Sequence, residues 1–166
     1  TGICRSKDYS TWRRPSKRFI GQDIYMPSVV GESMENLVVA IDTSGSVTQE
    51  EGNAFISEVV SVCSDVHPKQ LDLIYWDSEV DNHEVYEEGQ YDTILTSTKP
   101  SGGGGTHVGC VNKYIRDKNL TPDAVVILTD GGVEEDWGGV WQHPTLWVIT
   151  NDYYTSPHGI SIQLKT

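Results

Sequence analysis

Apolar residues form two kinds of pattern, one typical of strands and one typical of helices, and the two kinds alternate along the chain. Five apolar or β-branched segments predict strands, at residues 37–41, 71–76, 124–129, 146–150 and 160–164. A short run without polar alternation indicates a strand covered on both faces, as in a parallel sheet. Residues 79–86 are charged and alternating instead, which predicts an antiparallel edge strand. Residues 87–105 show neither pattern and are expected to form a loop.

Two segments carry the spacing of a helix with one buried face. The first is expected to begin at Thr48 and must end before His67-Pro68. Its apolar positions are spaced i, i+4, i+7 and i+11: Phe55, Val59, Val62 and Val66. The second is expected to begin at Thr106, with Val108, Val111 and Ile115 on its inner face. The alternation of strands and helices predicts a Rossmann-like, doubly wound α/β fold: a mostly parallel sheet with an antiparallel edge strand and helices on both faces.

The 166 residues suffice for one folded domain. Residues 1–35 have no clear period, so we predict an N-terminal basic-aromatic arm that packs on a domain formed by residues 36–166. The net charge is −12, although residues 1–18 hold six basic residues and one acid. An acidic body argues against nucleic acid as a partner and suits a cation or a basic partner. Docking on this body is the favoured role of the basic strip, and RNA or another domain are the alternatives.

Cysteine content and hydropathy bear on the compartment. The three cysteines are widely spaced, so the sequence predicts neither a disulfide framework nor a CxxC metal site. A single disulfide bond between two of them is the alternative. Reduced thiols indicate a cytoplasmic protein. The sequence contains no run of 18 apolar residues, so we expect neither a transmembrane helix nor a membrane partner.

Three polar segments stand at the ends of predicted core strands or at a helix start. They are Asp42-Thr43-Ser44-Gly45-Ser46, Thr106 and Asp130. Ligands of open α/β sheets bind outside the carboxyl ends of the strands, so these segments can face one crevice. Two carboxylates and three hydroxyls form an all-oxygen set that suits Mg²⁺ or Mn²⁺ ahead of Ca²⁺. We therefore predict a metal site made by Asp42, Ser44, Ser46, Thr106 and Asp130.

The order Asp-x-Ser-x-Ser, a later Thr and a later strand-end Asp resembles the metal-ion-dependent adhesion site of von Willebrand factor A (VWA) domains. The resemblance implies that Ser44, Ser46 and Thr106 bind the metal directly, whereas the two aspartates act through water. It further implies that an Asp or Glu of a protein partner completes the coordination. The function implied is a divalent-metal-dependent protein-interaction module.

A second resemblance covers most of the chain. The matching segments are Trp12-Arg13-Arg14-Pro15 with Arg18-Phe19, residues 40–46, Gly102-Gly103-Gly104-Gly105-Thr106, Leu128-Thr129-Asp130-Gly131 and Pro157-His158-Gly159. They resemble the bacterial and phage VWA-like domain found C-terminal to a metallopeptidase region. Relatives are often encoded beside MoxR-type AAA+ ATPases, which implies an adaptor or regulator role. The chain departs from this branch at His107, where an acid is expected, and this change bears on metal preference.

Several residues near these loops carry two interpretations. His107, Trp137 and Trp141 are predicted to form a rim that contacts the partner, while packing is the alternative for the tryptophans and a loop position for the histidine. Asp77 is expected to form a turn. The acids at residues 134–136 are expected to form a solvated face.

Signatures of catalysis are missing from the sequence. There is no HExxH, no G-x-S-x-G and no lysine after the glycine run, and the histidines are scattered. We therefore expect no catalytic activity in this chain. Three alternatives stay open: a metal-dependent hydrolase whose ion activates water, one part of a larger metallopeptidase whose catalytic half lies upstream, or a structural domain that has lost its metal.

Overall fold

The computed structural model describes residues 10–11, 28–29 and 34–165. Within the first 35 residues, β1 (Ser10–Thr11) and β2 (Ser28–Val29) pair antiparallel as a separate two-stranded sheet. Most of the predicted arm, including its basic-aromatic stretch and Cys4, lies outside the described residues. Its packing on the domain therefore stays a prediction.

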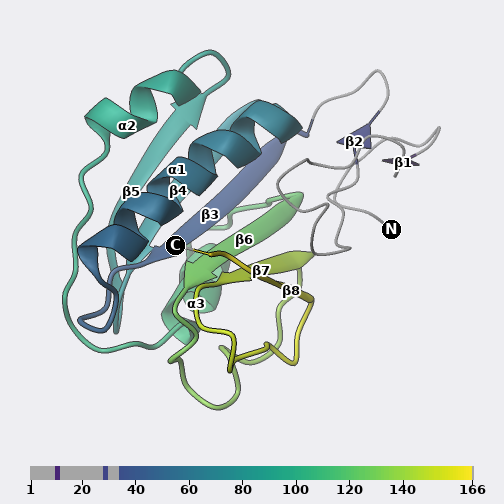
Figure 1. The fold of residues 1–166 in the computed structure, drawn as a ribbon. Helices are drawn as coiled ribbons and strands as arrows, with labels where there is room; N and C mark the ends of the chain where they lie inside the picture. Colours follow the sequence, from purple (N-terminus) through teal and green to yellow (C-terminus); the bar gives the residue numbers. More distant parts are fainter. Residues whose placement is uncertain (1–9, 12–27, 30–33, 166) are drawn as a thin grey trace.

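The centre of the molecule is a six-stranded sheet in the order β5-β4-β3-β6-β7-β8 (Figure 1). Its strands are β3 (Asn36–Asp42), β4 (Gln70–Trp76), β5 (Val80–Glu87), β6 (Ala124–Thr129), β7 (Thr145–Ile149) and β8 (Ile160–Gln163). All neighbours are parallel except β4 and β5, which pair antiparallel at one edge. The predicted α/β fold with an antiparallel edge strand is confirmed.

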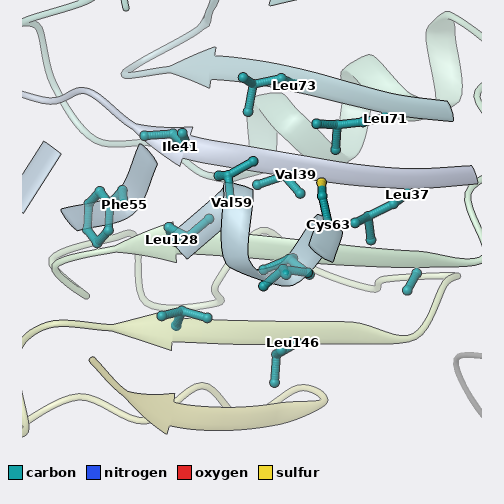
Figure 2. Close-up of a cluster of buried hydrophobic side chains, with 14 of the residues drawn as sticks. Leu37, Val39, Ile41, Phe55, Val59, Cys63, Leu71, Leu73, Leu128 and Leu146 are labelled. Carbon is teal, nitrogen blue, oxygen red and sulfur yellow. The ribbon is translucent and has the colours of Figure 1, made fainter. Parts of the chain in front are cut away.

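The helix α1 (Gln49–Val66) covers one face of this sheet, and α3 (Gly109–Asp117) covers the other (Figure 1). Alternate residues of β3 explain the two faces. Leu37, Val39 and Ile41 are buried with α1 (Figure 2), whereas Val38 and Ala40 are buried with α3. A strand buried on both sides has no polar alternation, which is why β3 reads as one apolar run.

The start of α1 follows the sequence closely. Thr48 accepts a hydrogen bond from the Glu51 amide, and the Glu51 side chain accepts one from the Thr48 amide. This reciprocal pair is a capping box, and it satisfies two amides that the helix leaves without a partner. The helix ends before His67, which adopts a left-handed conformation.

Two local predictions were wrong. Residues 87–105 are not loop throughout, because they contain the short helices η2 (Tyr91–Thr93) and α2 (Ile94–Ser97), and Ile94 is buried against the α1 side of the core. A single buried side chain produces no period in the sequence. The second error concerns α3, which begins at Gly109 rather than at Thr106. Thr106 therefore lies in the loop before this helix and is not its cap.

Candidate functional site

Asp42 is buried at the carboxyl end of β3, where two hydrogen bonds fix its side chain. Because β3 and β6 are paired, its side chain lies beside the end of β6. Its Oδ1 accepts a hydrogen bond from the Ser44 amide at 2.8 Å, and its Oδ2 accepts one from the Thr129 hydroxyl at 2.6 Å. Burial raises the pKa of Asp42, the bonds from Ser44 and Thr129 oppose that rise, and the charge of nearby Asp130 adds to it. The structure thus brings the two predicted aspartates together.

The two predicted serines lie in the turn that follows Asp42. Their hydroxyl oxygens are 3.2 Å apart, so each faces the other. Ser44 is buried and Ser46 is exposed, so the pair spans from the interior of the turn to its surface. The turn therefore presents two adjacent oxygen ligands beside a buried carboxylate.

The glycine-rich loop is packed directly onto this turn. The Gly45 amide donates to the Gly104 carbonyl at 3.0 Å. The hydroxyl of Thr43 lies within hydrogen-bond distance of the Ser101 carbonyl, at 2.8 Å. Gly102 has a φ of +152°, and a Cβ at this position would lie 2.0 Å from Thr43 Oγ1. Glycine is therefore required here by the close approach of the two loops.

Asp77, which follows β4, connects the glycine-rich loop to the position of Thr106. Its Oδ2 accepts from the Gly104 amide at 3.0 Å, and its carbonyl accepts from the His107 amide at 2.9 Å. Thr106 is thus fixed between two residues that are both bonded to Asp77. The predicted turn is present as well, because Asp77 Oδ1 accepts from the Glu79 amide. The additional role in holding the loop was not predicted.

A pH-dependent effect is expected next to this contact. Burial, together with the hydrogen-bonded and charged Asp77 beside it, raises the pKa of Asp81 to about 6. An acid whose pKa is higher in the folded state stabilises the fold while protonated, and this stabilisation is lost as the pH rises through 6. Asp81→Asn is therefore expected to raise Tm at neutral pH and to leave it unchanged at about pH 4.

Calorimetric melting across this pH range tests the expectation. The matched control is Asp92→Asn, because Asp92 is an exposed aspartate of η2. An equal gain at both pH values, or an equal gain in the control, would contradict the assignment to Asp81.

The donor chemistry of the three loops fits a hard divalent cation. Asp42 already accepts one protein hydrogen bond on each carboxylate oxygen, so contact with a metal through water leaves both bonds intact. Asp130 accepts one hydrogen bond on Oδ1, from the Gly132 amide. Carboxylates, hydroxyls and water are ligands that Mg²⁺ and Mn²⁺ favour. Among the described residues, no three His, Cys, Asp or Glu side chains are grouped as a metal site. The predicted metal site is not a group of this type, because three of its five residues (Ser44, Ser46 and Thr106) would contribute hydroxyl oxygens.

The predicted rim divides into buried and exposed members. Trp137 is only 7% exposed, and the Trp137 and Trp141 rings lie edge-on against Trp147 with centroids 5.2 and 5.5 Å away. Trp141 Nε1 also donates to the Trp137 carbonyl at 2.8 Å. Packing, the alternative given for these tryptophans, is thus their main role. The side chain of His107 is 58% exposed, which leaves it accessible to a partner.

Tyr154, whose ring lies beside the residue after Asp130, and its neighbour Tyr153 were not singled out from the sequence. Tyr154 lies against Gly131, because a Cβ on this glycine would approach the tyrosine ring to 2.6 Å. Tyr153 is 89% exposed. Residues 151–155 form no helix or strand, so no period in the sequence marks these rings.

The acidic segment after Asp130 is not simply a solvated face. Glu134 Oε2 accepts from the Val108 amide at 2.8 Å, and its Oε1 accepts from the Gly109 amide at 2.6 Å. This carboxylate satisfies the start of α3, which has no side-chain cap of its own. The expectation for Glu134 was wrong because the contact spans 25 residues and leaves no local pattern.

Comparisons with known proteins agree with this architecture. A family model described as VWA-like domain (DUF2201) matches residues 37–165. An uncharacterized protein of Thermotoga maritima is 28% identical over 123 residues. That match covers 74% of this chain but 28% of the relative, so the chain spans well under half of the relative's length. Among the described residues, none of the helices has the length and apolar character needed to cross a membrane.

Proposed function

The chain belongs to the VWA-like domain (DUF2201) family, and from that premise we propose that it is a divalent-metal-dependent protein-interaction module. The residues proposed to form the metal site are Asp42, Ser44, Ser46, Thr106 and Asp130. The supporting observation is the convergence of three loops from distant parts of the chain. The Gly45–Gly104 bond, the Asp77 bonds and the Thr129–Asp42 bond join these loops at the carboxyl edge of the sheet.

Each residue has a distinct role in this proposal. The hydroxyls of Ser44, Ser46 and Thr106 contact the cation directly. Asp42 is proposed to act through water, which leaves its bonds from the Ser44 amide and the Thr129 hydroxyl intact. The bound cation, Mg²⁺ or Mn²⁺, supplies one open coordination position that a carboxylate of the partner can fill. The protein's contribution is to hold the hydroxyls in place before binding, which lowers the entropic cost of assembling the site.

The proposed partner is a protein that presents Asp or Glu from a surface that is otherwise basic. The carboxylate meets the cation, while basic neighbours meet a chain whose net charge is −12. The exposed side chain of His107 directly follows Thr106 in the chain and is accessible to such a partner. A MoxR-type AAA+ ATPase, with this chain as adaptor or regulator, is our candidate for the partner. The alternatives of a hydrolase or of one part of a larger metallopeptidase rest on the sequence interpretation alone.

Titration calorimetry with Mg²⁺, Mn²⁺ and Ca²⁺ tests the metal site. The wild type is expected to bind Mg²⁺ and Mn²⁺ saturably, and the double variant Ser44→Ala, Ser46→Ala is expected to lose at least about tenfold in affinity. Ser101→Ala is the control, because Ser101 is exposed and contacts Thr43 only through its carbonyl. Absence of saturable binding in the wild type, or unchanged affinity in the double variant, would contradict the proposal.

A further inference from the structure

The segment after Asp130 lies across the first turns of α3. We call residues 131–141 the strap. Besides the two bonds from Glu134 to the Val108 and Gly109 amides, Asn112 of α3 donates to the strap carbonyls of Gly138 and Val140, at 2.9 and 2.7 Å. The strap and the start of α3 are therefore joined at two points one helical turn apart.

Glu134 is well suited to hold these two segments together. The first amides of a helix have no partner within it, and the helix dipole favours a negative charge at this end. Bonds from amides to a carboxylate are stronger than bonds between neutral groups. The Glu134 side chain is only 20% exposed, which reduces competition from water. Each of its two oxygens accepts one amide bond, so the carboxylate joins both amides at once.

The position of Glu134 along the chain links two parts of the proposed metal site. It follows Asp130 by four residues, and the amides that it holds follow Thr106 by two and three residues. The Thr106 loop is fixed on its other side by the bond from the His107 amide to Asp77. Glu134 therefore spans the loop that carries Asp130 and the loop that carries Thr106.

We propose that Glu134 is a positioning residue that joins the Thr106 and Asp130 loops into one unit and couples cation binding at these loops to the order of the start of α3. The coupling rests on the metal site proposed above. We call the two bonds from Glu134 to the Val108 and Gly109 amides the clamp. If the closed clamp raises the affinity for the cation, then the bound cation must stabilise the closed clamp by the same factor. The order of the first residues of α3 is therefore expected to increase when the cation is bound.

Three variants separate this role from loss of charge and from general destabilisation. Glu134→Ala removes the clamp, and Glu134→Gln keeps one oxygen acceptor. Glu135→Ala removes the same charge from the adjacent, exposed position. Mn²⁺ affinity is expected to fall about tenfold for Glu134→Ala, to lie between that value and the wild-type value for Glu134→Gln, and to stay within about twofold for Glu135→Ala.

Amide hydrogen exchange supplies a readout that does not depend on binding. In the presence of a chelator, the Val108 and Gly109 amides are expected to exchange at least about tenfold faster in Glu134→Ala, while those in the middle of α1 keep their wild-type rates. Mn²⁺ is expected to slow exchange of the two amides in the wild type, and to do so less in Glu134→Ala.

The outcomes distinguish the two proposals. If the wild type binds no Mn²⁺, the metal site fails and the coupling fails with it, whatever the exchange rates show. If the wild type binds Mn²⁺ and Glu134→Ala binds it equally well, only the coupling is overturned. Equal weakening by Glu135→Ala would also overturn it, because charge rather than the clamp would then account for the effect.

Discussion

Replacing Asp42 with asparagine is expected to leave the metal-free protein at least as stable as the wild type and to remove its stabilisation by Mg²⁺ or Mn²⁺. Burial raises the pKa of Asp42, so keeping this group charged at neutral pH works against folding. Asparagine avoids this cost and retains an oxygen for the Ser44 amide, while the Thr129 hydroxyl can rotate to accept from the new amide group. If the fold does not need the charge of Asp42, a role in cation binding explains why a carboxylate stands at this buried position.

The magnitude follows from mass action. A cation at 100 times its Kd stabilises the folded state by about 2.7 kcal/mol. For a domain of this size, that corresponds to a rise in Tm of roughly 5–10 °C. Calorimetric melting with chelator and with MnCl₂ would measure the rise in the wild type and its absence in Asp42→Asn.

Asp92→Asn serves as the control for this experiment, since it removes an exposed aspartate of η2 that is not part of the proposed metal site. It should retain the full effect of Mn²⁺. Two results would count against the interpretation: a large loss of stability of Asp42→Asn in chelator, which would make Asp42 a structural residue, or an undiminished response to Mn²⁺.

The sheet could be predicted because burial on both faces leaves a mark in the sequence. The run at residues 37–41 became β3, which extends one residue further at each end. The charged alternation at residues 79–86 became the antiparallel β5 within one residue. These patterns depend only on which face of each strand is covered, and a strand covered on both faces is mostly apolar along its length.

The candidate site was predictable to the same extent. Asp42 and Asp130 were grouped because both end parallel core strands, and paired β3 and β6 bring them to one edge. The contact that fixes Asp42 was not predictable, because Thr129 meets it only in the particular register of these two strands. A residue whose role depends on register looks like any other last residue of a strand.

Contacts between distant segments account for the remaining errors. The sequence placed the start of the second helix at Thr106, because threonine is a common helix cap. The amides at its start are instead satisfied by Glu134, which lies in the strap. Trp137 and Trp141 illustrate the same point, since their packing on Trp147 is fixed only once the strap lies over α3. Local patterns contain no information on pairs of this kind.

Thr129→Val is expected to destabilise the metal-free protein by about 3 kcal/mol, because it leaves a buried carboxylate oxygen without its donor. Thr129 is fully buried, and its hydroxyl both donates to Asp42 Oδ2 and accepts from the Gly131 amide at 3.1 Å. Valine fills the same volume but makes neither bond. The loss corresponds to a fall in Tm of roughly 6–12 °C, which urea unfolding and melting in chelator would both detect.

Two further variants assign this loss to the contact with Asp42. Thr129→Ser keeps the hydroxyl and removes one methyl group, so it is expected to cost about 1 kcal/mol. In an Asp42→Asn background, the cost of Thr129→Val is expected to shrink, because the group left without a donor is then neutral and is cheaper to bury. A double-mutant cycle isolates this difference as a coupling energy. A coupling near zero would mean that Thr129 acts through the Gly131 amide or through packing, and Asp42 would then owe its fixed position to the Ser44 amide alone.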